Sequence, residues 1–303
     1  MLTFVTLILA AAVLVLLAVA MGWVLGWANR AFYVYVDPKV VAIQDALPGA
    51  NCGGCGYVGC NSYADAIGVG EEEDLTLCGP GGTGCVSAMA DILGIEVTDV
   101  WPYKAVVHCA AKEDERLLKM DYEGEPTCAA ANLVAGFQGC TYGCMGLGDC
   151  VRVCDYDAMH IVDGVAVVDY EKCTGCKLCT AACPRNIITM VPFKRSEMFV
   201  VACSNDDFGK EVQSVCTVGC TGCMSCSRVS EFMVMEGNRP TVNYDAYEGM
   251  TDFEPILEKC KRSSLIFVGI PTEDQLAAVA DEEVPDRIEP DFQTTVDDTE
   301  WRG

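Results

Sequence analysis

The chain has 303 residues and a formal net charge of -24, from 44 acidic and 20 basic side chains. This acidity argues against a nucleic-acid-binding protein, because phosphates require a basic surface. The 21 cysteines stand in short runs, a spacing that disfavours disulfides between neighbours and favours the binding of a metal or cluster. The two histidines, His108 and His160, are too few and too isolated for a mixed Cys/His zinc protein or a haem protein.

Residues 2–28 form a predominantly apolar segment, and the first charged side chain after it is Arg30. The segment exceeds the roughly 20 apolar residues that a membrane-spanning helix needs. A cleaved signal peptide is the alternative, but it requires a basic start and a shorter apolar core. We therefore predict a transmembrane anchor over residues 1–29 that contacts the lipid bilayer through residues 2–28. Because Arg30 and Lys39 follow it, the positive-inside rule predicts a single-pass protein of the cytoplasmic membrane with its cluster domains in the cytoplasm.

Residues 30–100 contain the first cysteine group, which includes the sequence CGGCGYVGC. The candidate ligands are Cys52, Cys55, Cys60 and Cys78. Glycines between cysteines let the backbone turn tightly around a cluster and direct amides toward its sulfurs. We predict a small domain with one [4Fe–4S] cluster, and a zinc site with four cysteine ligands is the alternative.

Residues 137–195 contain two cysteine runs. The downstream run is Cys173, Cys176, Cys179 and Cys183, followed by Pro184; it matches bacterial ferredoxins, in which the fourth cysteine binds the other cluster. The upstream run is Cys140, Cys144, Cys150 and Cys154. Crossed pairing assigns one [4Fe–4S] cluster to Cys140, Cys144, Cys150 and Cys183, and another to Cys154, Cys173, Cys176 and Cys179. Asp163-Gly164 predicts a hairpin turn between the runs, so we expect a ferredoxin-like α+β module.

Residues 196–271 repeat this module with fewer ligands. The set predicted to hold one further cluster is Cys220, Cys223, Cys226 and Cys260. Ser230 stands where the fourth cysteine of the run is expected, so a second cluster has no ligands here. Two alternatives are Cys216 as the fourth ligand in place of Cys260, and a module without any cluster that serves only packing.

Five cysteines remain outside these sets, and we expect them to be buried thiols without a role in electron transfer. They are Cys85, Cys109, Cys128, Cys203 and Cys216. Residues 101–136 are predicted to be a linker. Residues 272–303 are acidic and cannot bury enough apolar surface to fold, which predicts a disordered tail or, alternatively, an acidic arm that tunes docking of a charged redox partner.

Four sequence stretches occur in a specific order over residues 1–270: CGGCGYVGC, DYEGEPTCAA, YGCMGLGDCVRVC and KCTGCKLCTAACP. With the anchor, this order resembles the B subunits of Rnf ion-translocating electron-transport complexes. The resemblance implies a subunit that relays electrons from or to ferredoxin beside other membrane and peripheral subunits, usually with NAD as the other redox partner. The third module departs from longer family members, which have two full cysteine runs there. The first motif also occurs in corrinoid iron–sulfur proteins.

The sequence therefore predicts an α+β chain with one N-terminal transmembrane helix, a small cluster domain and tandem ferredoxin-like modules. We predict a membrane-anchored electron-transfer subunit with three [4Fe–4S] clusters and a fourth in the last module. It is an enzyme only as part of an ion-translocating oxidoreductase, since no motif indicates a substrate-transforming active site. The alternatives are a tethered electron donor for a corrinoid or radical enzyme, and a zinc-loaded scaffold.

Overall fold

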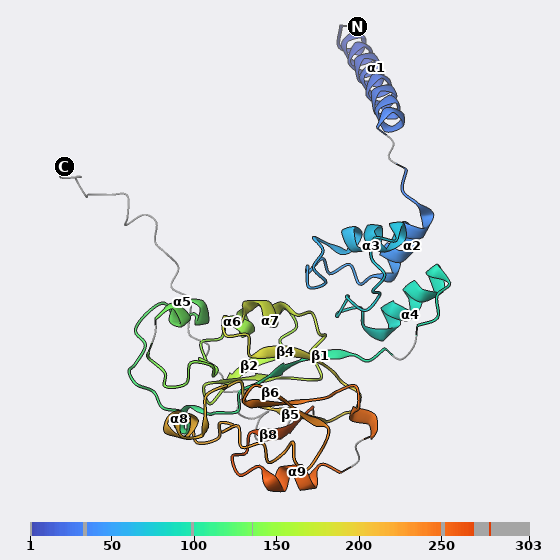
Figure 1. Cartoon of the computed structure of the whole chain (residues 1–303). Coiled ribbons are helices and arrows are strands. Elements are labelled where there is room, and N and C mark those ends of the chain that lie inside the picture. The colour runs from blue at the N-terminus through green and yellow to red at the C-terminus, as the bar shows by residue number, and fades with distance from the viewer. Residues whose placement is uncertain are drawn as a thin grey trace, which may run out of the picture.

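The computed structural model describes residues 2–32, 35–97, 100–134, 136–249, 252–269 and 279. The predicted acidic tail over 272–303 lies outside the described residues, apart from position 279. Helices and strands both occur, as the sequence predicts, and Figure 1 shows their order from the N-terminal helix to the last strand.

The first element is the helix α1, Leu2–Ala31, which corresponds to the predicted anchor. Residues 9–31 are long and apolar enough to cross a membrane, and none of the most apolar window of this segment is buried within the chain. Trp23 is 73% exposed. An apolar helix without an internal partner needs an apolar environment, which a bilayer supplies.

Three helices form the next domain: α2 Pro38–Ala46, α3 Cys60–Val69 and α4 Gly82–Leu93. Asp37 caps α2, because its carboxylate accepts a hydrogen bond from the Lys39 amide at 2.8 Å, and Pro38 suits the first helical position. Helix α2 packs on both α3 and α4. The apolar side chains between them include Ile43, Tyr63, Ile67 and Met89.

The rest of the described chain forms two halves with the same order of strands. The first half contains β1 Tyr103–Val107, β2 Met159–Val162, β3 Val165–Val168 and β4 Ile188–Pro192. Strand β1 pairs antiparallel with β4, and β2 with β3. The turn between β2 and β3 is the predicted one, with positive φ angles at Asp163 and Gly164, as a two-residue hairpin requires. Short helices connect the strands: α5 Cys128–Leu133, α6 Asp149–Arg152 and α7 Leu178–Ala182.

The second half repeats this arrangement. Its strands are β5 Met198–Val201, β6 Met233–Glu236, β7 Arg239–Val242 and β8 Leu265–Val268. Strand β5 pairs antiparallel with β8, and β6 with β7. Its helices are α8 Gly209–Val215 and α9 Glu254–Lys259. In Figure 1, α6 and α7 lie on one side of the strands and α9 on the other.

The two halves share one apolar core, which includes Val106 and Ile188 from the first half and Val200 and Leu265 from the second. Backbone hydrogen bonds also join the two halves, since the Ala110 amide donates to the Ala202 carbonyl at 3.1 Å. The structure therefore differs from the prediction that residues 101–136 are a linker. This segment supplies strand β1, because its apolar sequence completes a two-stranded sheet with β4.

Candidate metal centres

The first cysteine group has Cys52 and Cys55 on the loop before α3, Cys60 as the first residue of α3, and Cys78 on the loop before α4. Asn51 stabilises the start of α3, because its side-chain oxygen accepts a hydrogen bond from the Cys60 amide at 2.9 Å. Burial raises the pKa of Tyr63, and the charges of Asp74, Cys78 and Cys55 add to this rise. Tyr63 is therefore near both Cys55 and Cys78, which are far apart in sequence.

Cys85, which we predicted to be a spare buried thiol, lies beside this group on α4. A side-chain hydrogen bond from Cys85 lowers the pKa of Cys78 to about 6, while burial opposes this change. The Cys85 side chain is buried. It therefore adds a sulfur contact next to the predicted ligand Cys78.

One cavity in the first half is lined by the predicted ligands Cys154, Cys173, Cys176 and Cys179, and its volume is about 320 Å³, including space open to solvent. Burial raises the pKa of Cys179 to about 12, with contributions from the charges of Cys173, Cys176 and Cys154. The Ala158 amide donates to the Cys154 sulfur at 3.4 Å. The structure thus brings this predicted set together around one space, although its members come from both cysteine runs.

A second cavity, of about 330 Å³, has Cys144, Cys150 and Cys183 in its wall, and Cys128 is its fourth cysteine. The predicted set has Cys140 in that place. Helix α5 brings Cys128 here: Thr127 caps α5 by accepting from the Ala130 amide at 3.2 Å. Asp149 of α6 also accepts a hydrogen bond from the Ala129 amide at 2.9 Å.

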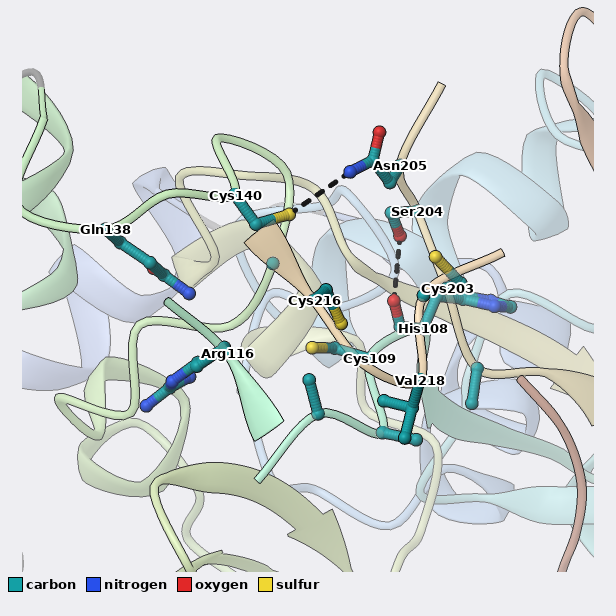
Figure 2. Close-up of a pocket in the computed structure, with 15 residues that line it drawn as sticks. His108, Cys109, Arg116, Gln138, Cys140, Cys203, Ser204, Asn205, Cys216 and Val218 are labelled. Atoms are coloured by element: carbon teal, nitrogen blue, oxygen red, sulfur yellow. Dashed lines mark hydrogen bonds between the residues drawn. The ribbon is translucent and has the colours of Figure 1, made fainter. Parts of the chain in front are cut away.

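Cys140 lines a third cavity, of about 390 Å³, together with Cys109, Cys203 and Cys216. Figure 2 shows these side chains, with the sulfur atoms of Cys109 and Cys216 turned toward each other. The prediction counted three of these four as buried thiols without a partner site. Cys109 and Cys203 stand apart from the dense runs, and Cys216 directly precedes the run that begins at Cys220. Only the folding of both halves brings the three together with Cys140.

The predicted set of the second half is also partly assembled. Burial raises the pKa of Cys220, and the charges of Cys260 and Cys223 contribute, so these thiols are neighbours. Cys226 is buried, whereas Cys223 is exposed. The Cys260 sulfur lies 3.6 Å from the Ser264 hydroxyl. Cys216, the alternative fourth ligand, lines the third cavity instead.

The donor sets fit iron–sulfur clusters better than single ions. Each of the three cavities has four thiols in its wall, and four thiolates are the usual ligands of a [4Fe–4S] cluster. Zinc instead draws four ligands to about 2.3 Å from one point. Among the described residues, no three Cys, His, Asp or Glu side chains converge in the way a single ion needs.

The helical domain contacts the first half through two loops. A Cβ atom at Gly54 would stand 1.9 Å from the Cys176 carbonyl oxygen, and one at Gly79 would stand 2.1 Å from the Gly175 carbonyl oxygen. Only glycine permits such close approach of two backbones. The loops that contain the first cysteine group therefore touch the loop of Cys176.

Family models agree with two of these sites. The FeS model, for an Fe-S cluster, matches residues 47–80, and the Fer4 model, a 4Fe-4S binding domain, matches residues 166–189. The first range includes Cys52, Cys55, Cys60 and Cys78, and the second includes Cys173, Cys176, Cys179 and Cys183.

Longer matches come from curated proteins. The B subunit of the Na(+)-translocating ferredoxin:NAD(+) oxidoreductase complex of Acetobacterium woodii is 37% identical over 222 residues, which cover 72% of this chain and 66% of the relative. The B subunit of the ion-translocating oxidoreductase complex of Methanosarcina acetivorans is 38% identical over 232 residues, covering 73% of this chain and 87% of the relative. The chain belongs to this family of B subunits. It is an iron–sulfur electron-transfer subunit of a membrane-associated oxidoreductase complex.

The family membership confirms the predicted resemblance and does not favour the corrinoid or radical-enzyme alternative. The B subunit of the proton-translocating ferredoxin:NAD(+) oxidoreductase complex of Clostridium ljungdahlii is 35% identical over 152 residues, covering 50% of this chain and 54% of the relative. The match covers just under two thirds of the Acetobacterium woodii protein and about half of the Clostridium ljungdahlii protein, so parts of these two relatives lie outside it.

Proposed function

We propose that this subunit relays single electrons between a soluble ferredoxin-like carrier and the other membrane and peripheral subunits of its complex. Bound [4Fe–4S] clusters supply the one-electron chemistry. The observation that carries the proposal is the contact of Gly54 and Gly79 with the Gly175–Cys176 loop, which brings two cysteine groups from different domains to adjoining loops. The names of relatives include ferredoxin, NAD and a translocated ion, and the proposal extends these partners to this chain.

The proposed ligands form four sets. They are Cys52, Cys55, Cys60 and Cys78; Cys128, Cys144, Cys150 and Cys183; Cys154, Cys173, Cys176 and Cys179; and Cys220, Cys223, Cys226 and Cys260. Cys128 replaces Cys140 of the sequence-based set because it shares a cavity with Cys144, Cys150 and Cys183. The two halves are proposed to be tandem ferredoxin-like modules, which the repeated strand order supports.

The chain's own residues keep water away from some of these sulfurs, although Cys223 is exposed. Cys144, Cys150 and Cys179 are each less than one tenth exposed, and the apolar side chain of Ile188 lines the same cavity as Cys144 and Cys150. Desolvation and backbone amides directed at sulfur are two means by which a protein sets a cluster's potential. We propose that α1 crosses the bilayer once and that the cluster domains lie on the cytoplasmic side.

The relay is tested with the purified full-length protein under anaerobic conditions. Reduced ferredoxin is mixed with the protein, and bleaching of the iron–sulfur absorbance is followed with time. We expect the absorbance of all clusters to decrease, and we expect every phase of this decrease to be fast. A protein that is colourless, or that contains zinc in place of iron, would contradict the proposal.

The contact between domains is tested by Gly54→Val, which places a side chain where the Cys176 carbonyl lies. The matched control is Gly84→Val in α4, because a Cβ atom at Gly84 meets no atom within 4 Å. We expect the Gly54→Val variant to contain as much iron as the wild-type protein. Part of its iron–sulfur absorbance should, however, no longer bleach in the fast phases. Equal rates in the two variants would show that electrons do not pass through this contact.

A further inference from the structure

The two halves are related by a repeat that extends beyond the ferredoxin-like ligands. Cys109 follows β1 and Cys203 follows β5, and the two residues pair as an antiparallel bridge at the junction of the halves. Cys140 and Cys216 begin equivalent loops, CTYGC in the first half and CTVGC in the second. Each half therefore contributes two cysteines from matching positions to the third cavity.

The hydrogen bonds to these sulfurs repeat as well. The Cys144 amide donates to the Cys109 sulfur at 3.3 Å, and the Cys220 amide donates to the Cys203 sulfur at 3.2 Å. The Asn205 side-chain amide donates to the Cys140 sulfur at 3.5 Å, as Figure 2 shows. Amides directed at sulfur stabilise thiolates and the clusters they bind.

Two equivalent arginines support the two loops. Arg185 donates to the carbonyl oxygens of Gly143 at 2.5 Å and Cys140 at 3.2 Å. Arg262 donates to the carbonyl oxygens of Cys216 at 2.6 Å and Gly219 at 3.3 Å. These cations hold the loops in shape and offset the negative charge of four thiolates, which would otherwise repel one another.

The third cavity resembles the two cavities with proposed cluster ligands in size, and most of its sulfurs are buried. Its volume is about 390 Å³, including space open to solvent, against about 320 and 330 Å³ on the same measure for the two cavities with proposed cluster ligands. Cys140, Cys203 and Cys216 are each less than one tenth exposed. Gly143 lies beside two of these sulfurs, because a Cβ atom there would be in ordinary van der Waals contact with the sulfurs of Cys140 at 3.4 Å and Cys109 at 3.6 Å.

We propose that Cys109, Cys140, Cys203 and Cys216 bind a further iron–sulfur cluster of the four-iron class, held between the two halves of the protein. This inference rests on the proposed iron–sulfur function and adds a site to it. It also explains why Cys128 lines the cavity of Cys144, Cys150 and Cys183, because Cys140 lines the third cavity and is not available as their fourth ligand. Twenty of the 21 cysteines then have a cluster, and Cys85 is the remaining thiol.

The test counts clusters in the full-length protein, purified anaerobically in detergent and reconstituted with iron and sulfide. Native mass spectrometry gives the number of clusters per chain, and Mössbauer spectroscopy gives their type. We expect five clusters, or about 20 iron atoms per chain, in the wild-type protein. The double variant Cys109→Ser/Cys203→Ser should lose one cluster and retain about 16 iron atoms.

The matched control is Thr141→Ser/Thr217→Ser, which changes exposed residues of the two equivalent loops and should retain five clusters. A wild-type protein that saturates at four clusters overturns the inference, even if the cysteine variant fails to fold. Zinc in this site, or a disulfide between Cys109 and Cys203 in the reconstituted protein, also overturns it. Failure of the proposed function gives a different result, a wild-type chain without any iron–sulfur cluster.

Discussion

Tyr247 illustrates how single side chains complete the junction between strands and loops. It is 0% exposed, and its hydroxyl accepts a hydrogen bond from the Phe199 amide of β5 at 2.7 Å. Tyr244 reaches the same residue, but it donates to the Phe199 carbonyl at 3.4 Å. Leaving a buried amide without a hydrogen-bond acceptor costs more free energy than losing a long hydrogen bond.

We predict that Tyr247→Phe lowers the free energy of unfolding by about 1–3 kcal/mol, because the Phe199 amide is left without an acceptor. Tyr244→Phe is the control and should lower it by less than about 1 kcal/mol. Anaerobic guanidinium unfolding of both variants, followed by circular dichroism, checks this. Equal losses would show that the Phe199 amide finds another partner.

Individual cysteines show where sequence-based ligand prediction stops. The dense run from Cys173 to Cys183 was readily interpreted, because its spacing is itself a ligand pattern. Cys128 was left out of every ligand set because it stands 12 residues before the upstream run, and Cys140 was placed with Cys144 because it begins that run. Their distribution between two cavities depends on helix α5 and on the loop that Arg185 holds.

At the scale of elements, helix α2 was predictable from its capping residues. Asp37 accepts the Lys39 amide and Pro38 begins the helix, as their positions in the sequence indicate. Strand β1 was not predictable in this way, because a strand of five residues gains its stability from a partner, β4, that lies far along the chain.

We predict that Asp37→Ala destabilises α2 by about 0.5–2 kcal/mol, because one amide at its first turn loses its acceptor. Asp37→Asn should cost little, since asparagine caps helices comparably well. Amide hydrogen exchange over residues 38–46 measures the effect. Unchanged exchange in Asp37→Ala would mean that packing on α3 and α4 alone maintains the helix.

At the scale of the whole molecule, the apolar surface of the described chain is concentrated on α1. Leu14, Leu16 and Trp23 are 67%, 70% and 73% exposed, while the halves beyond residue 100 share a closed core. The candidate membrane span and the cysteine-lined cavities therefore belong to separate parts of the chain.

We predict that removal of residues 1–34 transfers the protein from the membrane fraction to the soluble fraction and leaves its iron content unchanged. Cell fractionation with iron analysis, beside the full-length protein, checks this. If the shortened chain stays with the membrane in cells that lack the other subunits, a second membrane-binding surface must exist.

The sequence by itself determined the long apolar N-terminal helix, the hairpin at Asp163-Gly164, the iron–sulfur chemistry of the cysteine runs and the family, because each depends on composition or short spacing. Only the tertiary structure decided which thiols share a cavity. Two halves with matching strands bring Cys109 beside Cys203 and leave Cys128 to join Cys144. Such assignments depend on contacts between distant segments, and no local pattern contains the distances across a folded core.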